Sequence, residues 1–122
     1  MTIPENIPAN GLAIPLRASF TILKHLPLLA VASNNLGPRL LLFDDSIECL
    51  VITTRRRWLH EIDRIDALQT FGTQNIIFCW RRRLCAFTAN VGDADVLRSL
   101  LRYFSRQQLR LTERAGKIMT SG

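Results

Sequence analysis

The sequence predicts a mainly β domain with one C-terminal helix, built as a bent antiparallel sheet or partly open barrel of about seven strands. Short apolar and β-branched segments alternate with turn-forming residues over most of the chain, and one later segment repeats its apolar residues at helical spacing. The chain has 122 residues, of which 48% are hydrophobic. This is enough for one compact core without disulfide or metal support.

The strands follow one another with little chain between them. The aspartates and serine after residue 43 predict a turn and therefore a hairpin, and Gly72 with Thr73 predicts a second tight turn. Pro27 is expected to bend the chain after the first strand or to start a new segment. Residues 33–38, SNNLGP, are expected to form a loop because of their serine, asparagine, glycine and proline content. The expected strands are residues 19–25, 39–43, 47–54, 55–60, 64–71, 74–80 and 84–89.

The helix is expected to begin after Asp93 and to end near Gln107 or Gln108. Asp93 is a suitable N-cap, and Asp95 places a negative charge in the first turn. Each large apolar side chain contributes about 1.5 to 3 kcal/mol when fully buried, so this helix should close the sheet and decide whether the domain folds. Its apolar face comprises Val96, Leu97, Leu100, Leu101 and Phe104.

Two terminal segments are expected to flank the folded part. Residues 1–17 are rich in proline and asparagine, which predicts an extended segment over the surface. Residues 18–108 form the domain. Residues 109–122 are expected to be an extended tail that then frays, because Leu109 and Leu111 alternate instead of recurring at helical spacing.

The strand order, together with three stretches, resembles a bacterial pleckstrin-homology-like domain over residues 18–108. The stretches are RLLLFDDSIECLVITTRRRWLHEIDRIDAL at 39–68, FGTQNIIFCWRRRLCAFTANVG at 71–92 and DADVLRSLLRYF at 93–104. The resemblance implies a non-catalytic binding or scaffold domain that acts through protein contacts and self-associates as a homo-oligomer. Lipid binders and peptide binders also occur in this superfamily, so the fold alone does not name a ligand.

The charge of the chain is carried almost entirely by arginine. The net charge is +6, and of 16 basic residues only Lys24 and Lys117 are lysines. Arginine favours flat, bidentate contact with phosphate or carboxylate. The candidate anionic-ligand surface comprises Arg55, Arg56, Arg57, Trp58, Arg81, Arg82 and Arg83, and a second candidate is the helical stripe Arg98, Arg102 and Arg106.

The two arginine triplets act together only if they lie at the same end of the sheet. A corner at residues 61–63 would put the tips at 54–56 and 81–83 at opposite ends, whereas one bent strand over 57–70 would bring them together. We favour the corner, because a fourteen-residue strand is long for a small domain.

The arginine triplets have three interpretations. Attraction to an anionic membrane surface or a phosphate-bearing partner is one hypothesis, although each arginine contributes about 1 kcal/mol at best to membrane binding. A solvated hairpin tip that discourages edge pairing is the simpler interpretation. Nucleic-acid binding is disfavoured by the low aromatic content of 7% and the absence of a known recognition motif.

Catalysis and metal binding find little support in the sequence. His60, Glu61 and Asp63 lack the second histidine of a helical zinc motif, so an enzyme using His60 is a remote alternative. We expect no cofactor and no metal. The odd number of cysteines and the short apolar run at 26–32 predict a cytoplasmic protein with reduced thiols, with a location peripheral to a membrane as the alternative.

The hairpin at 74–89 raises two open questions. A three-residue turn would make Cys79 and Cys85 direct neighbours across the strands, whereas a two-residue turn would place Cys79 opposite Ala86. Both faces of the hairpin are apolar, so the face away from the core needs cover. That cover is either a second copy of the chain or the N-terminal residues Ile3, Ile7, Leu12 and Ile14.

Overall fold

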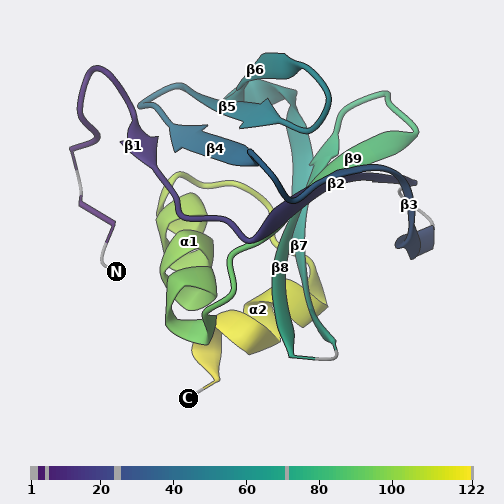
Figure 1. The fold of residues 1–122 in the computed structure, drawn as a ribbon. Helices are drawn as coiled ribbons and strands as arrows, with labels where there is room; N and C mark the ends of the chain where they lie inside the picture. The colour runs from purple at the N-terminus through teal and green to yellow at the C-terminus, as the bar shows by residue number, and fades with distance from the viewer. Residues whose placement is uncertain (1–2, 5, 24–25, 71, 122) are drawn as a thin grey trace.

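The computed structural model describes residues 3–4, 6–23, 26–70 and 72–121, with only the backbone for 26–31. Nine strands in two antiparallel sheets, one 3-10 turn and two α-helices are described, and the strands form no closed barrel (Figure 1). The first sheet has the order β1 (Leu12–Ala13), β4 (Arg39–Leu42), β5 (Ser46–Leu50) and β6 (Thr54–Trp58). The second has the order β3 (Leu26–Asn34), β2 (Ala18–Leu23), β9 (Cys85–Asn90), β8 (Thr73–Trp80) and β7 (Ile62–Thr70). The mainly β class is therefore confirmed.

The hairpins predicted after residue 43 and at Gly72–Thr73 are both present. β4 and β5 pair with Arg39 opposite Leu50, and β7 and β8 pair with Thr70 opposite Thr73. The strand expected at 47–54 ends at Leu50, because residues 51–53 form the turn into β6. Arg55, Arg56 and Arg57 lie inside β6, within the strand expected at 55–60, and the prediction of a hairpin tip at 54–56 is wrong.

A 3-10 turn, η1 (Leu59–Glu61), carries the chain from the first sheet to the second. This turn begins two residues before the corner predicted at 61–63. The strand expected at 55–60 therefore ends at Trp58. Glu61 accepts a hydrogen bond from the backbone N–H of Trp58 at 2.9 Å, which stabilises the bend. A single strand over 57–70 is excluded.

β3 was not among the expected strands. It contains Pro27 and pairs with β2 at the edge of the second sheet, where a residue without an N–H is tolerated. The register between the two strands is irregular around Ile22. The loop predicted from residue 33 begins after Asn34.

Helix α1 (Ala94–Arg106) forms as predicted. The Asp93 carboxylate accepts hydrogen bonds from the backbone N–H groups of Asp95 and Val96, which caps the first turn. Phe104 meets Phe78 of β8 edge to face, with ring centroids 5.3 Å apart. All five residues of the expected apolar face are buried, and so is Tyr103.

The C-terminal segment departs from the prediction of a frayed tail. The backbone N–H of Ile65 in β7 donates to the carbonyl of Arg110 at 2.8 Å, and that of Thr112 donates to the carbonyl of Ile65 at 2.9 Å. Thr112 then caps a second helix, α2 (Glu113–Thr120), whose Ala115 is fully buried. Helix α2 packs against α1 and β7.

The described part of residues 3–16 contains a turn closed by a hydrogen bond from the Gly11 N–H to the Pro8 carbonyl and the short strand β1, and it does not cover the outer face of the β8–β9 hairpin. Ile3, Ile7 and Ile14 are buried in the main core, which also holds Phe78. Leu12 packs against the same core and lies in β1, which pairs with β4. The interpretation that these residues cover the other face is therefore wrong.

The outer face of that hairpin has its own small cluster. Ile77 and Cys79 are buried there with Ile22 and Ala86, and Phe20 and Leu68 pack against them. These side chains are already buried within one chain. Their burial accordingly supplies no reason to invoke a second copy.

Candidate anion-binding pocket

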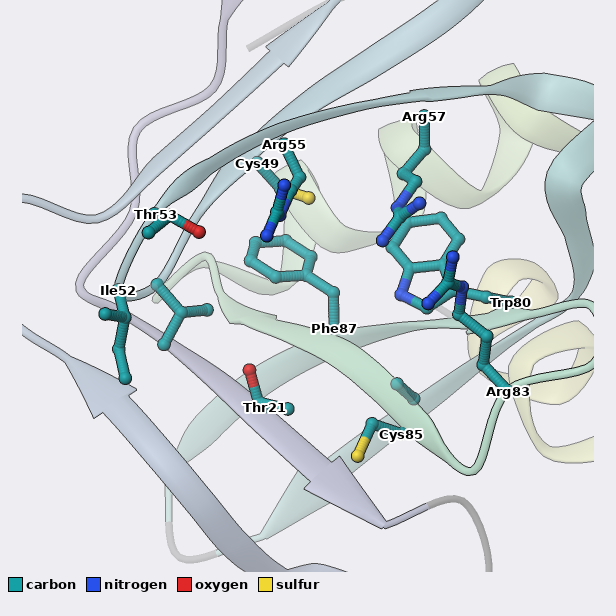
Figure 2. A pocket seen from close by; sticks show the side chains of 12 residues that line it. Thr21, Cys49, Ile52, Thr53, Arg55, Arg57, Trp80, Arg83, Cys85 and Phe87 are labelled. Carbon is teal, nitrogen blue, oxygen red and sulfur yellow. The ribbon is translucent and has the colours of Figure 1, made fainter.

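A pocket of about 230 Å³ lies between the edge strand β6 and the strands β2, β8 and β9 of the other sheet (Figure 2). Arg55 and Arg57 line it from β6, and Arg83 lines it from the β8–β9 loop. Figure 2 shows the three side chains pointing into the space between these elements. The other lining residues are apolar or neutral: Thr21, Cys49, Val51, Ile52, Thr53, Trp80, Cys85, Ala86 and Phe87.

The alternation of β6 explains why two of its three arginines enter the pocket. Successive side chains of a strand point to opposite faces, so Arg55 and Arg57 share one face and Arg56 lies on the other. Several contacts hold Arg56 there: its Nε donates to Ser46 Oγ at 2.9 Å, its guanidinium lies 4.0 Å from the centroid of the Phe43 ring, and Nη2 lies 3.7 Å from Asp45 Oδ1. Arg56 therefore does not contribute to the pocket.

Arg57 is fixed by two neighbours. Its guanidinium lies 5.7 Å from the centroid of the Trp80 ring, and its Nη1 lies 3.8 Å from Glu61 Oε2. Trp80 is itself buried at the end of β8. The aromatic wall thus orients this guanidinium before any ligand arrives.

Arg83 reaches the pocket because of the loop geometry at residues 81–84. Arg82 has a positive φ of 59°, the left-handed conformation that turns the chain between β8 and β9. Arg81 points elsewhere: its Nη1 lies 3.6 Å from Asp63 Oδ1, and its Nε donates to the carbonyl of His60 at 2.9 Å. Of the predicted surface, Arg55, Arg57 and Arg83 line the pocket, and Arg56, Trp58, Arg81 and Arg82 do not.

The prediction that a corner would keep the two triplets apart is wrong. The corner exists, but it folds one sheet over the other instead of extending a flat meander. β6 then faces the β8–β9 hairpin across the pocket, and Arg55 and Arg57 of the first triplet lie across from Arg83 of the second. A count of turns in a single sheet could not reveal this.

The charges of the pocket are poorly compensated. Within the described part of the chain, neither Arg55 nor Arg83 forms an ion pair, and no carboxylate lines the pocket. Burial raises the pKa of the Cys49 thiol to about 12, although the charge of Arg57 opposes that rise. Cys49 is therefore a neutral wall residue at physiological pH, and the pocket keeps its positive charge.

Register decides the arrangement of the other two cysteines. Cys79 lies opposite Ala86, and four residues, 81–84, connect the strands. Cys79 and Cys85 are consequently not direct cross-strand neighbours. Cys79 belongs to the outer cluster, whereas Cys85 lines the pocket.

The second candidate stripe lies on α1, away from the pocket. Arg98 pairs with Asp95, and Arg102 Nη2 donates to the carbonyl of Met119 in α2 at 3.5 Å. Arg106 is exposed at the helix end. Two of these three arginines thus hold local structure.

The residues of the remote enzyme alternative do not line this pocket. His60 is exposed in η1, and its carbonyl accepts from Arg81. Glu61 pairs with Arg57, and Asp63 pairs with Arg64 at 3.0 Å. Neither this group nor any other three acidic, histidine or cysteine residues among those described are arranged to hold a metal ion.

Sequence reasoning missed most of the pocket wall. Thr21, Cys49 and Phe87 come from three different strands, and no local pattern links them. The alternation of Arg55 and Arg57 in an expected strand was the one signal that could have separated the inward arginines from Arg56.

No protein-family model matches the chain, and no curated protein matches it significantly. None of the helices described has both the length and the apolar character required to cross a bilayer.

Proposed function

We propose that this chain is a non-catalytic binding domain of pleckstrin-homology-like architecture, which holds an anionic group of its ligand between β6 and the β8–β9 hairpin. The observation that carries the proposal is the convergence of Arg55, Arg57 and Arg83 on one pocket without a lining carboxylate. Guanidinium groups bind phosphate and carboxylate through paired N–H donors. Three of them from two walls can surround such a group.

The walls of the pocket favour binding of an anion over the interpretation that the arginines are only solvated. Trp80 and Phe87 are buried and lower the polarity of one wall, so an anion against that wall would interact more strongly with the half-buried Arg57 than at an open surface, whereas Arg55 and Arg83 are exposed. The ion pair of Arg57 with Glu61 is long, at 3.8 Å, and competes weakly.

The resemblance to bacterial pleckstrin-homology-like domains also favours binding to other proteins and self-association, and we propose both. The buried outer cluster removes one reason for a second copy. Peripheral membrane binding has one structural observation in its favour, because Ile52 and Leu84 are each 77% exposed on loops that adjoin the pocket arginines.

The test is anion binding by calorimetry at low salt, with inorganic pyrophosphate and citrate as probes. Arg55→Ser with Arg83→Ser should weaken binding of at least one probe about tenfold or more, because each lost charged hydrogen bond contributes about 1.5 to 3 kcal/mol. Arg82→Asn is the matched control: it removes a charge from the same loop but not from the pocket, and asparagine tolerates the left-handed backbone. The control should change binding less than twofold.

Two results would contradict the proposal. Equal weakening in the control would mean that only the overall charge attracts anions. If the wild-type protein binds neither probe at millimolar concentration, the pocket is not an anion-binding site.

A further inference from the structure

β6 is an edge strand, and its free edge lies beside the pocket. Its residues pair with β5, from Leu50 opposite Thr54 to Ser46 opposite Trp58. On its other side no strand among the described residues pairs with it. An edge of this kind presents unpaired backbone N–H and C=O groups to another extended chain.

The arginines of β6 restrict which chain can pair there. A second β6 would place arginine opposite or near arginine, and like charges directly across two strands are destabilising. The edge therefore disfavours a second copy pairing through the same strand. Opposite charges at those cross-strand positions are favourable, so the edge selects acidic segments.

The distance between Arg55 and Arg57 along β6 determines how far apart the acidic side chains of a paired segment should lie. Arg55 and Arg57 are two residues apart on one face, which corresponds to about 6.5 to 7 Å along the strand. A paired segment has the same repeat, so its side chains two positions apart lie beside both arginines. Arg83 stands on the opposite wall, where it can contact a carboxylate that enters the pocket.

We propose that the ligand is an extended acidic segment of a partner protein, with two carboxylates separated by one residue, which adds to the first sheet as a strand beside β6. The proposal rests on the anion-binding function and names its ligand class. Main-chain hydrogen bonds to β6 supply affinity, and the alternating carboxylates supply specificity. A free phosphate can use the arginines, but it cannot use the strand edge.

The experiment compares three peptides of equal charge by fluorescence polarisation against the full chain. One heptapeptide carries glutamates at its third and fifth positions, a second carries them at its third and fourth positions, and a third repeats the first with alternate backbone nitrogens methylated. The first should bind about tenfold more tightly than the second, because only alternate glutamates share one face. Methylation should abolish binding, because it removes the donors on the paired edge.

A direct readout accompanies the affinities. The first peptide should slow hydrogen exchange of backbone amides within Thr54–Trp58, and Arg55→Ser with Arg83→Ser should weaken binding while Arg82→Asn does not. Bilayer vesicles with and without anionic lipid form a further arm, with pelleting as the readout.

The outcomes separate this inference from the anion-binding function. Equal binding of all three peptides, or binding of pyrophosphate without binding of the first peptide, would overturn the strand pairing but leave the anion pocket standing. Tight pelleting with anionic vesicles and no peptide binding would assign the pocket to lipid instead. If neither pyrophosphate, citrate nor any peptide binds, both proposals are wrong.

Discussion

At the scale of single residues, Asp66 connects the sheet to the C-terminal helix. Its carboxylate accepts from Thr112 Oγ1 at 2.6 Å and from Arg114 Nε and Nη2 at 3.1 and 2.5 Å. Burial alone would raise the pKa of Asp66, but the hydrogen bonds from Arg114, Thr112 and the Ala67 backbone outweigh it, and the pKa lies below 3.8. The folded state therefore favours the ionised carboxylate.

Asp66→Asn should lower the free energy of unfolding by about 1 to 2 kcal/mol at neutral pH, since charged hydrogen bonds are lost at a partly exposed site. The wild-type contribution is present above the unfolded pKa of 3.8 and is lost as the pH falls through the lower folded pKa. Urea unfolding at several acidic pH values measures both effects, and the variant should show the shallower decline. Glu113→Gln, in an exposed pair with Lys117, is the control and should change stability by less than about 0.5 kcal/mol.

At the scale of elements, α2 depends on the surface beneath it. A helix of eight residues does not form on its own, because nucleation costs more than so few hydrogen bonds return. Here the backbone bonds between Ile65 and residues 110 and 112 position its start, and Ala115 is buried. Ile118 and Met119 complete a face that packs on the main core.

Substitutions at Gly116 test whether residues 113–120 form a packed helix or a loose tail. A Cβ at this position meets no atom within 4 Å, so Gly116→Ala should raise stability by about 0.5 to 1 kcal/mol. Gly116→Pro should lower stability by about 3 kcal/mol, because it removes the hydrogen bond from the Gly116 N–H to the Thr112 carbonyl. Thermal unfolding followed by circular dichroism reports both changes, and indifference to both substitutions would mean that α2 does not form.

At the scale of the whole molecule, α1 fills the space that the two sheets leave open (Figure 1). Leu97, Leu100, Leu101 and Phe104 are fully buried, and they share one cluster with Leu42 of the first sheet and Phe78 of the second. The helix is thus the common partner of both sheets. Its apolar residues contribute about 1.5 to 3 kcal/mol each, which is comparable to the net stability of a small domain.

A chain shortened to residues 1–92 should therefore lose its cooperative melt and expose apolar surface to a hydrophobic dye. A chain shortened to residues 1–111 keeps α1 and should still melt cooperatively at a lower temperature. Calorimetry and dye binding on the two truncations provide the comparison. A cooperative melt of the shorter chain would contradict the role given to α1.

Local patterns predicted the elements whose partners are near in sequence. The β4–β5 and β7–β8 hairpins follow from turn residues between β-prone stretches, and α1 follows from a capping aspartate and a regular apolar face. α2 could have been suspected from Thr112 before Glu113 and from the spacing of Ala115, Ile118 and Met119. The alternation of Leu109 and Leu111 led to the prediction of an extended tail instead of α2. These two residues precede the helix and form extended chain beside β7.

The amino-acid pattern by itself determined the mainly β class, the cap and apolar face of α1, and the predominance of arginine among the basic residues. Only the tertiary structure decided that Arg55, Arg57 and Arg83 share one pocket while Arg56 and Trp58 are excluded from it. The physical reason is that strand periodicity specifies which side chains share a face, whereas the angle at η1 and the packing of two sheets around α1 specify what that face meets.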